Sequence, residues 1–150
     1  MTRILPLLAP LALAAGLITA APAAHAAEFT ILIYETDADL AARTDPARAT
    51  AYWGAYNAFA GKLAQAGVLR GGTALSETEA RTVTVRGGDA RVEPKARTRH
   101  GTRAGGYFVI DVADLDAAVR WAEQAPGVAS GAVEVRPHRA NPMMPMTPMR

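Results

Sequence analysis

Residues 105–137 read GGYFVIDVADLDAAVRWAEQAPGVASGAVEVRP, and this stretch decides the fold. Residues 106–111 are rich in aromatic and β-branched side chains, which is typical of a buried strand. Asp114 then provides a helix N-cap, and the apolar residues that recur on one face of the helix after it are Leu115, Ala118, Val119 and Ala122. Residues 132–136 alternate as a last strand, which Pro137 ends.

The chain before this stretch repeats the pattern of strand and helix. Residues 29–34 (FTILIY) predict a buried strand, and Asp45-Pro46 is a helix-start signal. Gly67 stands where the helix is expected to end with a residue in the left-handed backbone conformation. The apolar residues between these two signals recur at steps of three and four, and they are Ala49, Tyr52, Tyr56, Phe59, Leu63 and Ala66.

The middle of the chain adds two short strands and a basic loop. Residues 68–75 and 81–86 predict strands, and the second leaves through the turn Gly87-Gly88-Asp89. Residues 93–104 have no period and predict a loop. The resulting order, βαββ(β)αβ, predicts an α+β, ferredoxin-like fold with an antiparallel sheet and two helices on one face. The open face needs a cover, so we expect a second copy and a dimeric α/β barrel.

The first 26 residues have the pattern of a cleavable signal peptide. Arg3 precedes a broken apolar run of residues 4–18, and Ala24-His25-Ala26 is a cleavage signal, so we expect a mature start at Ala27. The alternative, an uncleaved membrane anchor, needs about 20 apolar residues, more than this run has. No twin arginine is present, which favours the Sec route. We therefore expect a periplasmic or secreted protein, with residues 27–137 as one domain and no stable membrane insertion.

Composition excludes several classes of function. The chain has no cysteine, which excludes a thiol nucleophile and a cysteine-ligated zinc. Loss of Arg3 with the signal lowers the formal charge from +2 to +1, too little for a nucleic-acid-binding protein. The chain has no dinucleotide fingerprint, P-loop or His-Glu-x-x-His motif, and neither of its two serines, Ser76 and Ser130, sits in a nucleophile elbow. We expect no cofactor.

Residues 29–137 resemble the YCII-related family, and in particular its branch named for an Asp-Gly-Pro-Phe motif. The segments that carry the resemblance keep the family's order and spacing. They are residues 31–34 (ILIY), 66–69 (AGVL), 71–75 (GGTAL), 105–111 (GGYFVID), 114–118 (DLDAA) and 131–137 (GAVEVRP).

The resemblance implies the ferredoxin-like fold and dimerisation, and a few relatives have lyase-like or dehalogenase-like activity with a His and Asp pair. This sequence departs from the pattern at two places. Pro94-Lys95-Ala96-Arg97 replaces the Asp-Gly-Pro-Phe motif, and Thr73 stands at a frequently acidic position. These departures argue against an inherited activity.

The basic loop, residues 91–103, is the most distinctive local feature. Its cations are Arg91, Lys95, Arg97, Arg99 and Arg103, against the single acid Glu93. Arginine forks bind carboxylates and phosphates bidentately, so we take Arg97, Arg99 and Arg103 as candidate anion ligands. The alternative is a solvated loop whose charges bind nothing specific.

His100, within this loop, is the candidate acid–base group, with Asp111 or Glu134 as its partner. The alternative for His100 is a merely exposed side chain. Glu134 and Arg136 share a face of the last strand, where they form either a ligand-facing pair or a salt bridge. Tyr107 is a further candidate ligand residue, and Tyr34, Tyr52 and Tyr56 either line a pocket or belong to the core.

Residues 138–150 are rich in proline and methionine and predict a disordered tail. The tail contains Met143, Met144, Met146 and Met149. Their thioether groups are soft metal ligands, which favour copper(I). The prolines among them favour plain disorder instead, and we assign no metal.

The sequence therefore predicts an exported, dimeric domain that binds a small organic molecule, anions included, in a sheet-lined cleft. One alternative is a small lyase or isomerase in which His100 carries the proton. Another is a protein-interaction module, in which case the cleft is filled by the domain's own side chains.

Overall fold

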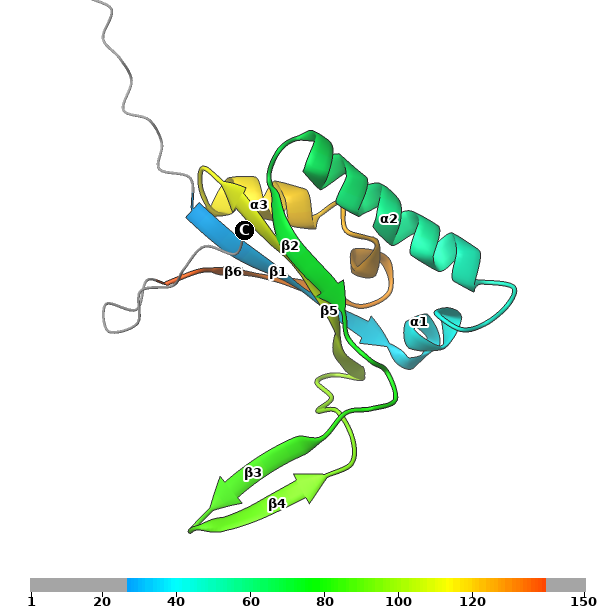
Figure 1. The fold of residues 1–150 in the computed structure, drawn as a ribbon, viewed down its shortest axis with the longest axis vertical. Helices are drawn as coiled ribbons and strands as arrows, with labels where there is room; N and C mark the ends of the chain where they lie inside the picture. The colour runs from blue at the N-terminus through cyan, green and yellow to red at the C-terminus, as the bar shows by residue number, and fades with distance from the viewer. Residues whose placement is uncertain (1–26, 140–150) are drawn as a thin grey trace, which may run out of the picture.

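A computed structural model of the chain describes residues 27–139. Its main sheet has four antiparallel strands in the order β2-β5-β1-β6 (Figure 1). Their bounds are β1 Ala27–Thr36, β2 Leu69–Ala74, β5 Thr102–Val112 and β6 Ala132–Pro137. The pairing of the outer strands with β5 and β1 is the ferredoxin-like topology, so the predicted fold class is confirmed.

Two helices cover one face of this sheet. They are α2, Ala49–Gln65, and α3, Leu115–Ala122, and a short 3₁₀ helix η1, Pro126–Ala129, follows α3 (Figure 1). The buried core lies between helices and sheet, with Phe59 and Leu63 of α2 against strand residues such as Ile31 and Ile110. No helix within residues 27–139 is long and apolar enough to span a bilayer.

The sequence predicts residues 29–34 as a buried strand, and the structure buries one face of this strand. In β1, Phe29, Ile31 and Ile33 are buried beneath the helices, whereas Leu32 and Tyr34 lie on the opposite, open face and are partly exposed. A register shift between Ile33 and Tyr34 interrupts the β1–β5 ladder. The extra residue of this bulge is Gly105 of β5, which belongs to the polar site described below.

The first helical turn after β1 is α1, Asp37–Ala42, which the sequence analysis did not predict. Thr36 and Asp39 form a reciprocal capping box at its start. Six residues are too few to show a helical period, which explains the omission. The helix expected from Asp45-Pro46 begins later, at Ala49, because the Asp45 side chain closes a turn on the Ala47 amide at 2.8 Å.

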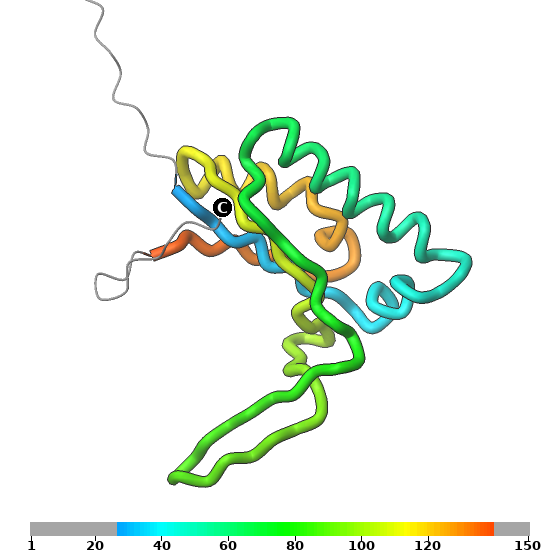
Figure 2. Tube along the Cα trace, viewed as in Figure 1, coloured from blue at the N-terminus to red at the C-terminus, as the bar shows by residue number. Residues whose placement is uncertain are grey.

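A separate hairpin, here called the arm (residues 82–93), leaves the body of the molecule. It consists of β3, Thr82–Arg86, and β4, Asp89–Glu93, which within the described residues pair only with each other (Figures 1 and 2). The predicted basic loop was therefore wrong at both ends, because Arg91 lies in β4 and Arg103 in β5. Residues 89–93 contain one strong β-former, Val92, so pairing with β3 rather than propensity makes this strand.

The start of the predicted tail is bound to the sheet. His138 donates its backbone N–H to the Glu28 carbonyl at 2.8 Å, and its Nε2 lies 2.7 Å from the Thr30 hydroxyl. The predicted signal peptide, residues 1–26, and the methionines of the tail lie outside the described residues.

Candidate functional site

A buried polar cluster lies at the end of β1, beneath the first half of α2. Glu35 is 1% exposed and Arg43 is 6% exposed, and their side chains form an ion pair. Oε1 of Glu35 accepts hydrogen bonds from the phenols of Tyr52, at 2.5 Å, and Tyr56, at 3.0 Å. Glu35 therefore has three donors, which compensate its removal from water.

Arg43 joins four segments of the chain through its guanidinium group. Nε donates to the Tyr52 phenol at 2.9 Å, and Nη1 donates to the carbonyl of Leu75 at 2.6 Å. Nη2 donates to Glu35 and, at 2.7 Å, to the carbonyl of Gly105. Nη1 also lies 3.5 Å from the carboxylate of Glu77. All donor groups of Arg43 are occupied in this way. From the end of α1, Arg43 thus links α2, β5 and the segment after β2 to Glu35.

The alternation of β1 and one glycine explain why the cluster forms here. Glu35 continues the series of buried, helix-facing positions that begins at Phe29. Gly105 lies opposite, and a Cβ at this position would overlap the carboxylate of Glu35 and come within 2.8 Å of Nη2 of Arg43. The absence of a side chain at Gly105 therefore makes room for the ion pair.

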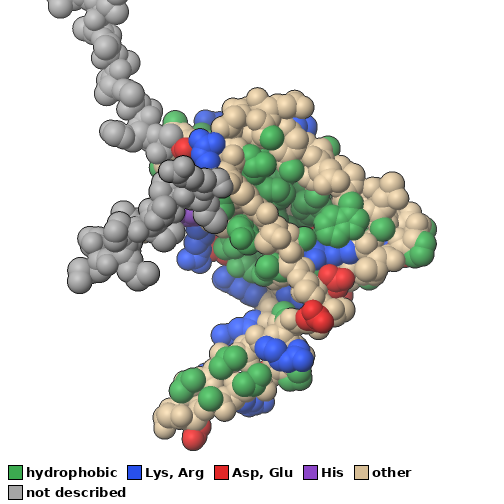
Figure 3. Space-filling model, viewed as in Figure 1, with side chains coloured by type: hydrophobic (Ala, Val, Ile, Leu, Met, Phe, Trp, Pro, Cys, Tyr) green, Lys and Arg blue, Asp and Glu red, His purple; other side chains and the backbone are tan. Residues whose placement is uncertain are grey.

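An interior pocket of about 160 Å³ adjoins this cluster, between α2 and the sheet. Gly72 and Gly106 line the sheet side of the pocket, and neither position has room for a side chain, because a Cβ on either would approach a carbonyl of the neighbouring strand to within 2.8 Å. Figure 3 shows hydrophobic side chains gathered beside β2, on the side of α2. The side chains that carry most of the pocket's chemistry are Glu35, Tyr52, Trp53, Tyr56, Asn57 and Phe108.

The electrostatics of the interior pocket keep its phenols neutral. Burial raises the pKa of Tyr52 and of Tyr56 above the ordinary value, and the charge of Glu35 raises both further. Burial opposes the charge on Arg43, but the hydrogen bond to Tyr52 and the charge of Glu35 outweigh it and raise the pKa of Arg43. The pocket therefore presents a carboxylate, neutral phenols and a guanidinium that is already paired.

Three residues predicted from the sequence line a different cavity, at the sheet edge away from α2. Arg99, His100 and Glu134 share this cavity of about 400 Å³ with Tyr34. His100 is exposed and has a φ of 51°, and it begins a two-residue turn that the Arg99 and Thr102 backbones close at 2.7 and 3.0 Å. Histidine tolerates this left-handed region better than most residues.

The other predicted residues do not join His100. Asp111 is nine residues along β5 from Thr102, which is about 30 Å at the rise of a strand, and it pairs with Arg70 at 2.8 Å. Arg103 pairs with Asp37. Tyr107 lies on the open face, opposite Leu32.

Glu134 and Arg136 do share a face of β6, as the alternation predicts, and their side chains form an ion pair at 2.6 Å. The hydrogen bond from Arg136 is the main cause that lowers the pKa of Glu134. The two charges largely neutralise each other.

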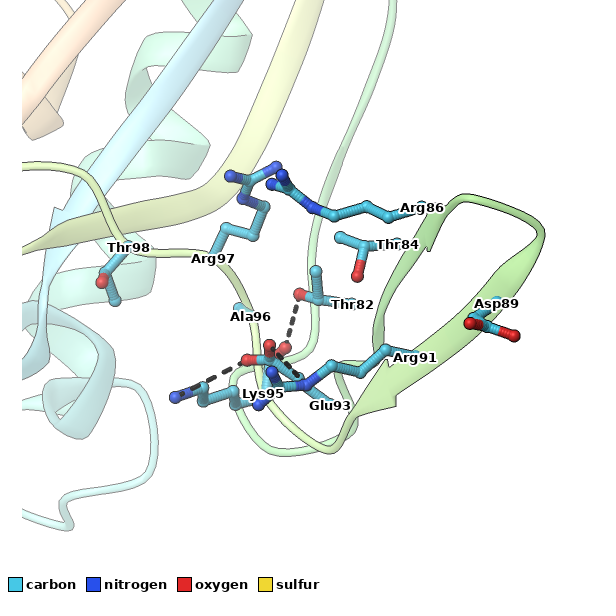
Figure 4. Close-up of a pocket in the computed structure, with 10 residues that line it drawn as sticks. All are labelled: Thr82, Thr84, Arg86, Asp89, Arg91, Glu93, Lys95, Ala96, Arg97 and Thr98. Carbon is cyan, nitrogen blue, oxygen red and sulfur yellow. Dashed lines mark hydrogen bonds and ion pairs between the residues drawn. The ribbon is translucent and has the colours of Figure 1, made fainter.

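Arg97 lines a third cavity, of about 690 Å³, on the polar face of the arm (Figure 4). Glu93 forms ion pairs with two of the cations there, Arg91 at 3.4 Å and Lys95 at 3.7 Å. Figure 4 shows Arg86 and Arg97 reaching toward each other from the two sides of this cavity. Among the described residues neither of these two arginines has an acidic partner within 4 Å.

The comparison with protein families decides the relationship of this chain. The model of the YCII-related domain matches residues 27–140, which is most of the sequence. The chain belongs to this family. No curated protein matches the chain. Within residues 27–139, the YCII-related domain gathers no group of three histidine or acidic side chains that could hold a metal ion.

Sequence reasoning missed the central pair of the interior pocket, although one signal was present. Glu35 is a single charge in a run of alternate apolar residues, Phe29, Ile31 and Ile33, so the period of β1 marks it as buried. A buried carboxylate requires a cation. Arg43 had no such mark, because it follows the short helix α1, where no period can be read.

Proposed function

We propose that this YCII-related domain binds a small, neutral organic molecule with one ring and a hydrogen-bond donor, in the interior pocket. The observation that carries the proposal is the buried carboxylate of Glu35 at the wall of a preformed, aromatic-lined pocket. Such a combination of burial, perturbed pKa values and a cavity is typical of ligand sites.

The size of the interior pocket supports a single ring. Its volume of about 160 Å³ is close to the roughly 150 Å³ of an apolar protein cavity known to take up benzene. Tyr52, Tyr56 and Phe108 supply aromatic surface for edge or offset stacking. Trp53, which is 37% exposed, lies at the mouth, where its indole N–H donates to the Arg43 carbonyl at 3.1 Å.

The hydrogen-bonding capacity of the cluster supports a donor on the ligand. A carboxylate has about four acceptor sites, and three donors already approach Glu35. A ligand O–H or N–H can occupy the remaining site. An anionic ligand meets the charge of Glu35 and gains nothing from Arg43, whose donors are occupied.

Thermal unfolding with a panel of single-ring compounds tests this proposal. Phenol and aniline are expected to raise the Tm, toluene to raise it less, and benzoate to leave it unchanged. We expect a Kd of about 1 mM for a fragment of this size, and a ligand concentration of about ten times that Kd then stabilises the fold by about 1.4 kcal/mol. This corresponds to a shift of a few degrees.

The matched control uses two alanines of α2. Ala60 lines the interior pocket, so Ala60→Met is expected to fill it and abolish the phenol shift. Ala64 is exposed on the same helix, so Ala64→Met should retain the shift. A benzoate shift equal to that of phenol, or equal behaviour of the two variants, would refute the assignment.

A second candidate function, anion binding, is favoured by the arm cavity. Arg86 and Arg97 line it together with the hydroxyl of Thr84, and arginine pairs suit phosphate oxygens (Figure 4). Inorganic phosphate is expected to raise the Tm at low salt, and the double variant Arg86→Ala/Arg97→Ala should lose at least half of this shift. Arg99→Ala is the control, since Arg99 lines a different cavity. A loss with Arg99→Ala alone would move the anion site to that cavity.

The proposal also includes export to the periplasm or the exterior. It is supported by the sequence of residues 1–26, which has the pattern of a Sec signal peptide. The intact mass of the exported protein is expected to show a start at Ala27, and an uncleaved start would contradict export by this route.

A further inference from the structure

The arm has an exposed apolar face. Val83 and Val92 lie directly opposite each other on its two strands, and Val85 is opposite Ala90. Val83, Val85 and Val92 are 61%, 63% and 59% exposed, and Figure 3 shows hydrophobic side chains on the arm's surface. A lone two-stranded hairpin is at best marginally stable in water, so this face is expected to need a cover.

The body of the molecule has an apolar groove that also lacks a cover. It runs between α3 and β6, has a volume of about 420 Å³, and is lined by Leu115, Val119, Ala122, Val128, Val133 and Val135. The sequence predicts Leu115 and Val119 on the inward face of α3, yet they are 46% and 38% exposed. The apolar stripe of α3 therefore extends onto a face of the helix that no other part of the described chain covers.

The groove lies beside a free strand edge. Within residues 27–139, β6 pairs with β1 alone, so its outer backbone edge has no strand partner. The five-residue strands of the arm match the six residues of β6 in length. A strand added to this edge, with its valines on the side of Val133 and Val135, would lie over the groove.

The arm does not cover the groove of its own chain. It connects β2 with β5, whereas β6 lies at the opposite edge of the sheet from β2. Figures 1 and 2 show the arm extending away from α3. The exposed face and the groove are therefore complementary surfaces of one sequence that only two copies can bring together.

We propose that the arm of one copy docks along β6 of a second copy, with Val83, Val85 and Val92 covering the groove between α3 and β6. The proposal includes reciprocal docking, in which each arm of a twofold dimer lies on the groove of the other copy, because a one-way contact between two different surfaces would leave an arm and a groove free for further copies. Arg81 precedes β3 in the same alternation as Val83 and Val85, so in this arrangement it would lie on the valine side, toward the exposed Glu123 at the rim of the groove.

Cysteine crosslinking between two singly substituted proteins tests the docking. The natural chain has no cysteine, so Val85→Cys in one preparation and Val119→Cys in the other introduce the only thiols. After the two full-length preparations are mixed and mildly oxidised, we expect a disulfide-linked heterodimer. Thr84→Cys is the matched control, because Thr84 points to the opposite face of β3, and we expect it to give at least tenfold less crosslinked product with Val119→Cys.

Equal yields from Val85→Cys and Thr84→Cys would overturn the proposal, and so would the absence of crosslinked product. A second measurement does not depend on thiol geometry. Light scattering over a dilution series is expected to give a dimer for the natural chain, and Val85→Glu/Val92→Glu, whose substituted side chains are on the surface, should dissociate at an at least tenfold higher concentration. A natural monomer, or a double variant that dissociates at the same concentration as the natural chain, would also overturn it.

Discussion

Replacing Arg43 with methionine is expected to lower the free energy of unfolding by about 3–5 kcal/mol, the usual effect of removing one partner of a buried ion pair. The substitution leaves Glu35, 1% exposed, without a cation. It also removes the donors to the carbonyls of Leu75 and Gly105. Urea unfolding of the variant and the natural protein measures the difference directly.

The double variant Glu35→Met/Arg43→Met is the control for this interpretation. It removes both charges, so no uncompensated ion stays buried, and we expect it to be more stable than Arg43→Met alone. A double variant that loses the sum of the two single effects would show that the two side chains act independently. A loss below about 1 kcal/mol in Arg43→Met would show that the pair is solvated.

Gly105→Ala is expected to destabilise the fold by at least about 2–3 kcal/mol, the range for overpacking a buried site. The added methyl group would occupy the position of the Glu35 carboxylate, so the ion pair with Arg43 would have to move or break. The φ of Gly105 is outside the positive range, so the loss comes from space and not from backbone strain. The variant should lose the phenol shift as well.

Gly61→Ala is the matched control for this steric argument. Gly61 lies within α2, and a Cβ there would meet nothing within 4 Å. The substitution is expected to stabilise the protein by about 0.5–1 kcal/mol, because alanine loses less entropy than glycine in a helix. If Gly105→Ala proved as harmless as Gly61→Ala, the close packing around Glu35 would be contradicted.

The fold was predictable because its elements depend on periodic burial. The apolar run of residues 29–34 and the alternation of residues 132–136 match β1 and β6, and the glycine expected at the end of α2, Gly67, has a φ of 72°. The arm was less predictable. Its second strand depends on pairing with the first, which local composition does not reveal.

The candidate site was less predictable than the fold, for a physical reason. Long-range contacts create it, since Arg43 donates to Gly105, 62 residues away, and Glu35 accepts from Tyr56, 21 residues away. The basic loop, by contrast, attracted attention through composition alone. Four of its cations are divided between two cavities, and the fifth, Arg103, pairs with Asp37. The tyrosines on the α2 stripe, for which the sequence allowed either a pocket or a core role, line the interior pocket.

Amide chemical-shift mapping with phenol tests most directly whether the interior pocket is the binding site of this YCII-related domain. In 10 mM phenol, we expect shifts in the α2 segment 52–60, at Gly72 and Thr73 of β2, and at Gly105 and Gly106 of β5, since these positions line the pocket. The arm, residues 82–93, should be unaffected. Shifts confined to the arm or to the cavity of His100, or no shifts at this concentration, would contradict binding in the interior pocket.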